Sequence, residues 1–463
     1  MKYVHFSFIL LLFTIRTVGQ TNYYETSFGT TNIETFRSLK LGTDSTIYLA
    51  GFSNATASTN NNIVLAKLNY AGQVLWTKQI TDTLYTAALY INTTNDNNFI
   101  ICGETEYGPN NKDGFIIKLD TAGTIIWRKQ FVLPNNQTLK YCMQTTTGHI
   151  ITCGATNDSF GGYDNWLVKL SPNGTLIYSK TYGTATNEYA DQVKETPEGN
   201  YLLTADVLTT ATNSYDIELF KLDTAGNVIW DKIYGDELQN GCQGVLVTST
   251  NNYLSYGESN VAKNLYFDFW IDLINPQGDT IWHKQFGGAY SDAVFGAVEV
   301  SDGFVFTGYS SSYNNGAPAD VVVFKTDTLG NLLWQHTYGT IGVDIGYEII
   351  KGIHNDFFVT GKYNVNNDDF YLLHIDANGL TISNTMFKTP AINAFPNPST
   401  GEVFFTNTVK SIKVINALGE VVYYNNLLQC NSVNLSHLIN GLYSVQLIDN
   451  SFKINTIQLS IIK

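Results

Sequence analysis

The chain repeats itself in steps of 49 to 52 residues, and this period constrains its fold more than any other feature of the sequence. Seven glycines mark the repeat, each placed in a turn just before an apolar segment: Gly72, Gly123, Gly174, Gly226, Gly278, Gly330 and Gly379. In the first six units a large aromatic residue follows the glycine by four positions: Trp76, Trp127, Tyr178, Trp230, Trp282 and Trp334. The seventh unit departs from this pattern with Ser383.

A second small residue keeps the same step and ends a short apolar run in every unit: Gly51, Gly103, Gly154, Ala205, Gly257, Gly308 and Gly361. A third apolar run, such as Phe115 to Leu119, lies between the two markers. Each unit therefore has room for four short strands and their turns. Only 14% of the residues are Asp, Glu, Lys or Arg, whereas strand and turn formers are plentiful, so we expect an all-β protein.

A unit of about 51 residues with four short strands is typical of one blade of a β-propeller. A single such sheet cannot bury both faces, but a ring of sheets buries each against its neighbours, with the periodic aromatic residue between them. We predict a seven-bladed β-propeller over residues 20–389. The segment Tyr23 to Gly29 resembles the end of a repeat and can close the ring, and Thr381 to Phe387 competes for the same place. The sequence leaves both closures open.

The first nineteen residues predict a cleaved secretory signal peptide, because Lys2 precedes the apolar run Phe6 to Phe13 and small residues follow. No stretch of the chain is long and apolar enough to predict a transmembrane segment. The net charge is −14, and it becomes −16 without residues 1–19, whose only charged residues are Lys2 and Arg16. Such acidity disfavours nucleic acid as a partner, since nucleic acid is bound through clustered cations.

The repeat breaks after Phe387, and a short linker over residues 390–394 leads to a different segment, 395–463. This segment has four motifs in order: Pro396-Asn397-Pro398 with Gly401, Val414 to Gly419, Leu435 to Leu438, and Asn440-Gly441-Leu442-Tyr443, before the terminal Lys463. Together they resemble the type A C-terminal sorting domain of the type IX (Por) secretion system of Bacteroidetes. The propeller repeat also resembles those of surface proteins from the same bacteria.

The resemblance implies that the segment folds as a small immunoglobulin-like β-sandwich. It also implies two partners, the type IX translocon and a sortase-like peptidase. The expected destination is the medium or the outer-membrane cell surface, after periplasmic export. The motif residues that the resemblance marks as the sorting signal are Pro396, Asn397, Pro398, Gly401, Gly419, Gly441, Tyr443 and Lys463.

An acidic residue recurs five positions after the glycine that ends a blade: Glu34, Glu188, Asp292 and Asp344. Because this loop leads into the innermost strand, the four carboxylates are candidates for a ligand site at one mouth of the central channel, holding a cation or a polyol. The alternative is that each carboxylate caps its own turn through backbone N–H groups. A second recurring acid, such as Asp320, is regular enough to indicate turn chemistry.

The sequence predicts no catalytic residue, no cofactor and no metal. The histidines lack metal-ligand spacing, and there is no nucleophile elbow or phosphate-binding glycine loop. The pattern Lys-Leu-Asp-x-x-Gly-x-x-x-Trp at Lys118 to Trp127 resembles the tryptophan-docking repeat of quinoprotein dehydrogenases, where it is a packing device. Cys142 and Cys153 are equidistant from Thr147-Gly148, which suggests a disulfide across a hairpin. The odd total of five cysteines leaves at least one free thiol.

These features favour a non-enzymatic binding or interaction module for an extracellular glycan or protein ligand. The alternatives are an extracellular polysaccharide- or peptide-degrading enzyme with catalytic carboxylates on loops, and a structural component of an envelope layer. Near-uniform loop lengths favour binding or structure. The sequence does not name the ligand.

Overall fold

In the computed structural model, the described residues run from 24 to 463 except 29–32, 55–60, 81–84, 108–110, 158–161, 211–212, 236–237, 261–265, 315–317, 341, 365–367, 382–393, 396–398, 417–420, 426–429 and 450–453. The chain divides into two compact units, Met1–Ile382 and Ser383–Lys463. Within the described ranges the secondary structure is β, apart from the 3₁₀ turn η1 (Ser312–Asn314). No helix in those ranges has the length and apolar character needed to cross a bilayer.

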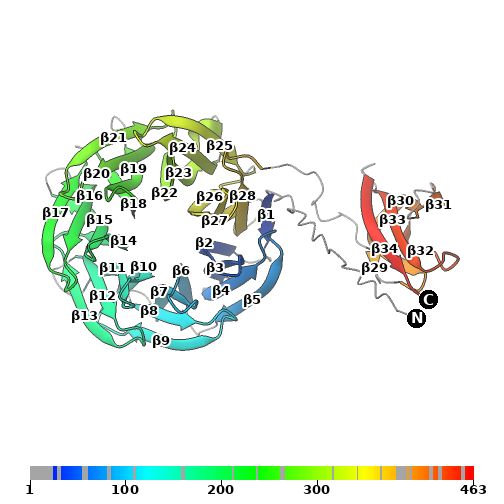
Figure 1. The fold of residues 1–463 in the computed structure, drawn as a ribbon, viewed down its shortest axis with the longest axis horizontal. Helices are drawn as coiled ribbons and strands as arrows, with labels where there is room; N and C mark the ends of the chain where they lie inside the picture. The colour runs from blue at the N-terminus through cyan, green and yellow to red at the C-terminus, as the bar shows by residue number, and fades with distance from the viewer. Residues whose placement is uncertain are drawn as a thin grey trace, which may run out of the picture. The chain divides into compact units, whose positions relative to one another are not determined.

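The first unit is a ring of seven four-stranded antiparallel sheets, so the predicted seven-bladed propeller is confirmed (Figure 1). Blade 1 contains β2 (Ile33–Leu41), β3 (Ile47–Asn54), β4 (Asn61–Leu68) and β5 (Val74–Ile80). Blade 2 contains β6 (Tyr85–Thr93), β7 (Phe99–Glu106), β8 (Lys112–Leu119) and β9 (Ile125–Phe131). Blade 3 contains β10 (Gln137–Gln144), β11 (Ile150–Thr156), β12 (Asp164–Leu170) and β13 (Leu176–Tyr182).

Blade 4 contains β14 (Glu188–Glu195), β15 (Tyr201–Thr209), β16 (Ser214–Leu222) and β17 (Val228–Tyr234). Blade 5 contains β18 (Asn240–Val247), β19 (Tyr253–Asn260), β20 (Phe267–Ile274) and β21 (Thr280–Phe286). Blade 6 contains β22 (Asp292–Val300), β23 (Gly303–Ser310), β24 (Asp320–Asp327) and β25 (Leu332–Tyr338). Blade 7 contains β26 (Ile345–Lys351), β27 (Phe357–Asn364), β28 (Asp368–Ile375) and, from the other end of the propeller sequence, β1 (Tyr24–Phe28).

The ring is closed by β1, which pairs antiparallel with β28 and places Tyr24 opposite His374. In the other blades this position of the outermost strand holds the periodic aromatic residue, as Trp76 does opposite Lys67. Tyr24 therefore supplies the aromatic ring that the seventh repeat lacks, which explains the departure at Ser383. The rival segment Thr381 to Phe387 falls, after its first residue, outside the described residues.

Six of the seven turn glycines lie against the aromatic residue of the preceding blade, and the seventh, Gly278, lies against the Lys232 side chain of that blade. A side chain at Gly174 would come within 3.0 Å of the Trp127 ring, and one at Gly72 within 2.5 Å of the Tyr24 ring. The φ of Gly174 is +84°, which residues with a side chain rarely adopt. The glycine–aromatic period in the sequence is thus a contact between neighbouring blades, repeated around the ring.

The cores lie between adjacent sheets, as the propeller prediction required. Leu65 of β4 and Phe115 of β8 belong to one buried cluster against which Trp76 packs. The third strand of a blade is buried along its length, as in β12, because sheets cover both of its faces. Burying each large apolar side chain contributes about 1.5 to 3 kcal/mol.

A buried polar network joins blade 7 to blade 1 at the closure. The Asp356 carboxylate accepts hydrogen bonds from the Tyr70 hydroxyl at 2.7 and 2.8 Å, and lies 2.6 Å from Nε2 of His374. The Tyr70 hydroxyl in turn accepts the N–H of Ile353 at 2.8 Å. Asp356 and His374 are almost completely buried. We call Tyr70, Asp356 and His374 the closure network.

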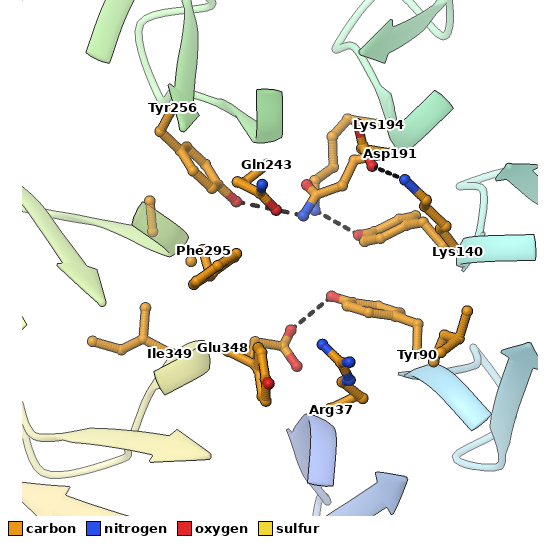
Figure 2. A pocket seen from close by; sticks show the side chains of 16 residues that line it. Arg37, Tyr90, Lys140, Asp191, Lys194, Gln243, Tyr256, Phe295, Glu348 and Ile349 are labelled. Carbon is orange, nitrogen blue, oxygen red and sulfur yellow. Dashed lines mark hydrogen bonds and ion pairs between the residues drawn. The ribbon is translucent and has the colours of Figure 1, made fainter. Parts of the chain in front are cut away.

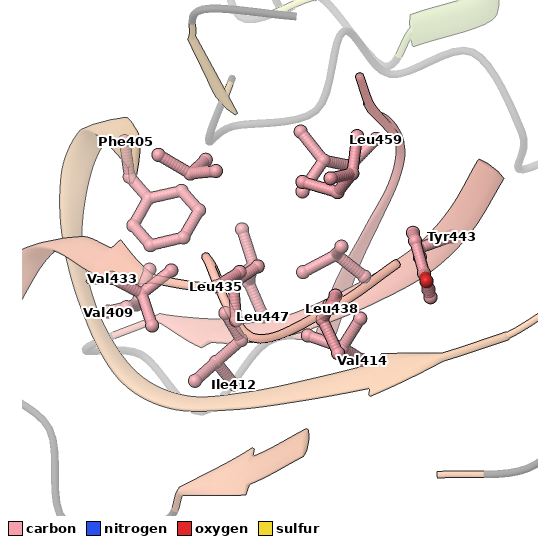
Figure 3. Close-up of a cluster of buried hydrophobic side chains, with 13 residues drawn as sticks. Phe405, Val409, Ile412, Val414, Val433, Leu435, Leu438, Tyr443, Leu447 and Leu459 are labelled. Carbon is pink, nitrogen blue, oxygen red and sulfur yellow. The ribbon is translucent and has the colours of Figure 1, made fainter. Parts of the chain in front are cut away.

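The second unit is a small sandwich-like β structure. It consists of β29 (Ala394–Phe395), β30 (Glu402–Ile415), β31 (Val421–Asn425), β32 (Cys430–Asn434), β33 (Gly441–Asp449) and β34 (Ile454–Ile461). The long strand β30 pairs with β29, β31, β32 and β33, and β34 pairs with β33. Figure 3 shows its core, in which Phe405, Leu447 and Leu459 converge. The predicted fold class, a propeller followed by an immunoglobulin-like sandwich, is confirmed.

Candidate functional site

Every innermost strand of the propeller carries a β-bulge at the same point of the repeat. The pairing with the second strand skips one residue per blade: Arg37, Leu89, Lys140, Asp191, Gln243, Phe295 and Tyr347. Opposite each bulge stands the second small residue of the repeat, such as Gly51. A side chain at Gly51 would lie 1.9 Å from the Thr35 carbonyl oxygen, so the bend of the bulge leaves no room for one.

The seven bulge residues all line one central cavity of about 390 Å³. Figure 2 shows the side chains of Arg37, Lys140, Asp191, Gln243 and Phe295 converging on this cavity from different blades. Its volume lies within the range of small-molecule sites. The bulge residues share a position but no chemistry, since they include two cations, one carboxylate, one amide and three apolar or aromatic side chains. A scaffold needs like residues at like positions, so this variety indicates a site rather than a packing role.

The Glu348 carboxylate in the cavity wall is fixed in position by four hydrogen-bonding partners. It accepts hydrogen bonds from the Ser38 hydroxyl at 2.6 Å, the Leu39 N–H at 2.8 Å and the Tyr90 hydroxyl at 2.7 Å, and it pairs with the Lys40 ammonium. These partners come from blades 1 and 2, whereas Glu348 belongs to blade 7. The carboxylate therefore connects three blades, and its acceptor sites are largely occupied.

An ion pair joins blades 3 and 4, because the Lys140 ammonium of blade 3 pairs with the Asp191 carboxylate of blade 4. Burial alone would lower the pKa of Lys140, but the carboxylates of Asp191 and Asp206 hold this pKa above its ordinary value. Burial and the Asp191 carboxylate raise the pKa of Asp206 well above its usual range. Lys140 is thus a cation at neutral pH, and the Asp206 side chain accepts the Cys242 N–H at 2.6 Å.

Two further cationic side chains line the cavity and have no carboxylate as an ion-pair partner among the described residues. Arg37 stacks over the Tyr347 ring at 4.2 Å, and the Lys194 ammonium donates to the Tyr141 hydroxyl and lies 4.4 Å from that ring. Among the described residues, neither Arg37 nor Lys194 forms an ion pair. Burial and the positive charge of Lys40 lower the pKa of Lys194 to about 8.

The four carboxylates predicted for the channel mouth are buried, but none lines the cavity: Glu34, Glu188, Asp292 and Asp344. Each binds groups of its own blade. Asp344, for example, accepts the N–H of Thr340 and the N–H of Asn364, both at 2.6 Å. These are the contacts of turn capping, and ligand binding at the four positions remains a prediction. Burial and the Asp344 carboxylate raise the pKa of Asp320 to about 6.

Across the part of the chain that the structure covers, no three His, Cys, Asp or Glu side chains gather in a way that could hold a metal ion.

The suggested Cys142–Cys153 disulfide is not formed, because both residues are free and buried thiols. Cys142 lies opposite Thr152, and Cys153 lies opposite Tyr141. The turn between the strands spans five residues, from Thr145 to His149, and shifts the pairing by one position relative to the sequence symmetry. The two thiols therefore point to opposite faces of the sheet.

Within the second unit, three residues of the sorting motif have clear structural roles. Gly401 has φ +129°, and a side chain there would lie 2.5 Å from the Ser436 Cα. The buried Tyr443 donates its hydroxyl to the Ile439 carbonyl at 2.8 Å, and the Lys463 N–H bonds the Asn440 side chain at 2.9 Å. Gly441 begins β33, and a side chain there would make ordinary van der Waals contact with the Tyr443 ring, at 3.6 Å. The remaining motif residues lie outside the described residues: Pro396, Asn397, Pro398 and Gly419.

The seven blades and the separate small sandwich define the class of the protein: a β-propeller with a C-terminal accessory domain. Residues 393–463 match the family described as secretion system C-terminal sorting domain. The chain is therefore a β-propeller protein with a C-terminal sorting domain of the type IX (Por) secretion system, as the sequence resemblance implied.

Three solved structures are similar to the chain. The first is the extracellular domain of a putative one-component system from B. thetaiotaomicron, with 11% sequence identity over 96% of this chain and 58% of that chain and a TM-score of 0.46. The second is PorZ of Porphyromonas gingivalis, a surface component of its type-IX secretion system, with 12% identity over 96% of this chain and 60% of that chain and a TM-score of 0.44. The third is a protein of unknown function from Dyadobacter fermentans, with 11% identity over 77% of this chain and 98% of that chain and a TM-score of 0.45. The chain thus spans 58% and 60% of the first two. No curated protein matches it.

Proposed function

We propose that the protein is a non-enzymatic binding module, delivered to the cell surface or the medium by type IX secretion, and that its propeller holds an extracellular ligand in the central cavity. One observation carries the binding role. At the seven bulges the repeat keeps the backbone geometry and varies the side chain, so that charged, amide and aromatic groups surround one space.

The delivery step is proposed from the sorting domain. It predicts handling by the translocon and by a sortase-like peptidase, after export through a cleaved signal peptide. Removing residues 393–463 should leave the protein in the periplasm of a Bacteroidetes host that has the secretion system, whereas the full chain should reach the surface or the medium. Equal export of both forms, measured by cell fractionation, would reject this part of the proposal.

The binding role is tested with the full exported chain on a glycan array and on a panel of extracellular proteins. Saturable binding that a substitution at the Gln243 bulge weakens, with an unchanged unfolding temperature, supports the proposal. Binding that is indifferent to the bulge residues would place the ligand elsewhere.

An extracellular hydrolase is the second candidate, because two carboxylates, Asp191 and Glu348, line the same cavity. Hydrolysis of a glycoside requires such a pair, one acting as acid and the other as base or nucleophile. Both carboxylates lie on strands and not on loops, and each is already bound by a lysine. Turnover of a polysaccharide or peptide by the full chain, lost on substitution of either carboxylate, would establish the enzyme and reject the binding role.

A further inference from the structure

The cavity wall is more positive than the protein that contains it. Three cationic side chains line it, namely Arg37, Lys140 and Lys194, against two carboxylates, Asp191 and Glu348, although the whole chain has a net charge of −14. Lys140 is paired with Asp191, and Glu348 is paired with Lys40 of β2 in the neighbouring blade. Arg37 and Lys194 are the cations whose charge these carboxylates leave uncompensated.

The two cations are held by aromatic rings and keep donors for a ligand. The Arg37 guanidinium lies over Tyr347, and its buried Nε has no hydrogen-bond partner within the described part of the chain. Lys194 donates one of its three protons to the Tyr141 hydroxyl. Figure 2 shows Arg37 and Lys194 on different sides of the same cavity. Because burial disfavours an uncompensated charge, an anion between these groups would gain strong charge-assisted hydrogen bonds.

The rest of the wall matches a hydroxylated ring rather than a bare inorganic anion. Phe295, Ala297 and Ile349 also line the cavity and add apolar surface, and the Phe295 ring lies 5.7 Å from the Tyr347 ring. Gln192 and Gln243 add amide groups, each of which can donate to and accept from hydroxyls. The wall thus combines aromatic and aliphatic surface with charged and amide groups, and a small polar organic molecule can use both.

We propose that the cavity binds an acidic saccharide unit, with the carboxylate of a uronic acid held by Arg37 and Lys194 and one face of the sugar ring against Phe295. This inference rests on the proposed binding function and gives its ligand class. The unit belongs to a free sugar or to an acidic polysaccharide, and both present the same carboxylate.

The test is calorimetric titration of the full chain with galacturonate, oligogalacturonate, galactose and a galactose oligomer, and with inorganic phosphate and sulfate as reference anions. The acidic sugars should bind at least 10-fold more tightly than their neutral counterparts. Arg37→Gln and Lys194→Gln should each weaken acidic binding by about 10-fold to 100-fold, the loss expected for one hydrogen bond to a charged group. Lys78→Gln is the matched control, because Lys78 is exposed on the outermost strand β5 and should leave binding unchanged.

The outcomes separate the ligand class from the binding function. Equal affinity for acidic and neutral sugars, or unchanged binding by both cavity variants, overturns the acidic-saccharide inference while the protein is still a binding module. Preference for inorganic phosphate or sulfate over all sugars overturns it as well. If none of these probes binds, the inference fails, and the array experiment alone decides the broader function. Tighter binding of the oligomer than of the monomer would identify the polysaccharide as the source.

Discussion

The closure network offers a quantitative test of how the ring is held together. Replacing Asp356 by Asn removes the charge that Tyr70 and His374 bind, but it keeps the size of the side chain. A hydrogen bond to a charged group contributes about 1.5 to 3 kcal/mol, and breaking a buried charged pair costs about 3 to 5 kcal/mol. Since Asn keeps one acceptor oxygen, we expect Asp356→Asn to lower the free energy of unfolding by about 3 kcal/mol at pH 7.

The pH dependence of this loss follows from the direction of the pKa shift. Burial alone would raise the pKa of Asp356, but the hydrogen bonds from His374 and Tyr70 outweigh it and hold the pKa below its ordinary value. A carboxyl group with a lowered folded pKa stabilises the protein above its unfolded pKa, about 3.9, and loses this effect as the pH falls through the folded pKa. The difference between wild type and Asp356→Asn should therefore shrink below about pH 4.

The assay is urea unfolding followed by tryptophan fluorescence at pH 7 and at pH 3, with Asp302→Asn as the matched control. Asp302 pairs with Lys325 at the surface and is 63% exposed, so its loss should cost less than about 1 kcal/mol. A double variant with Tyr70→Phe should show coupling of about 1 kcal/mol. The reasoning is refuted if Asp356→Asn costs no more than the control, or if its cost is the same at both pH values.

Three other predictions concern the propeller. Tyr24→Ala should destabilise the ring by about 3 kcal/mol, since the aromatic residue over Gly72 is lost at the closure, and thermal unfolding measures this loss. Burial raises the pKa of Glu258 to about 7, so stability should fall as pH rises from about 4.5 to 7, and Glu258→Gln should flatten that slope in urea titrations at successive pH values. The four buried cysteines, Cys102, Cys142, Cys153 and Cys242, should react with a thiol reagent only after unfolding, and a native protein that contains a disulfide between any two of them would contradict the structure.

The blade architecture was predictable because its sequence signals are packing constraints repeated in every unit. The turn glycine and the aromatic residue recur since each blade must fit the next one, as Gly174 and Trp127 show. The closing strand could not be chosen from the sequence, because two segments had suitable patterns. Pairing of β1 with β28 settles the choice and assigns Tyr24 to the seventh blade.

The candidate site escaped prediction for the opposite reason. Its residues share a place in the backbone and differ in side chain, so no repeated letter marks them. The signal that was present is the second small residue, for example Gly51, which the bulge at Arg37 requires. Cys142 and Cys153 illustrate a related limit, because their relative positions depend on how many residues the turn from Thr145 to His149 contains.

The pairing of residue 24 with residue 374 also fixes the order in which the propeller can be completed. A chain synthesised from its N-terminus exposes β1 long before its partner strand β28 has been made. Strand β1 therefore remains unpaired while the first six blades form. Deleting β1 at the N-terminal end of the propeller, or β28 at its C-terminal end, removes the same strand pairing. A fragment cut at one end should then open between blade 7 and blade 1, with the remaining sheets still paired internally.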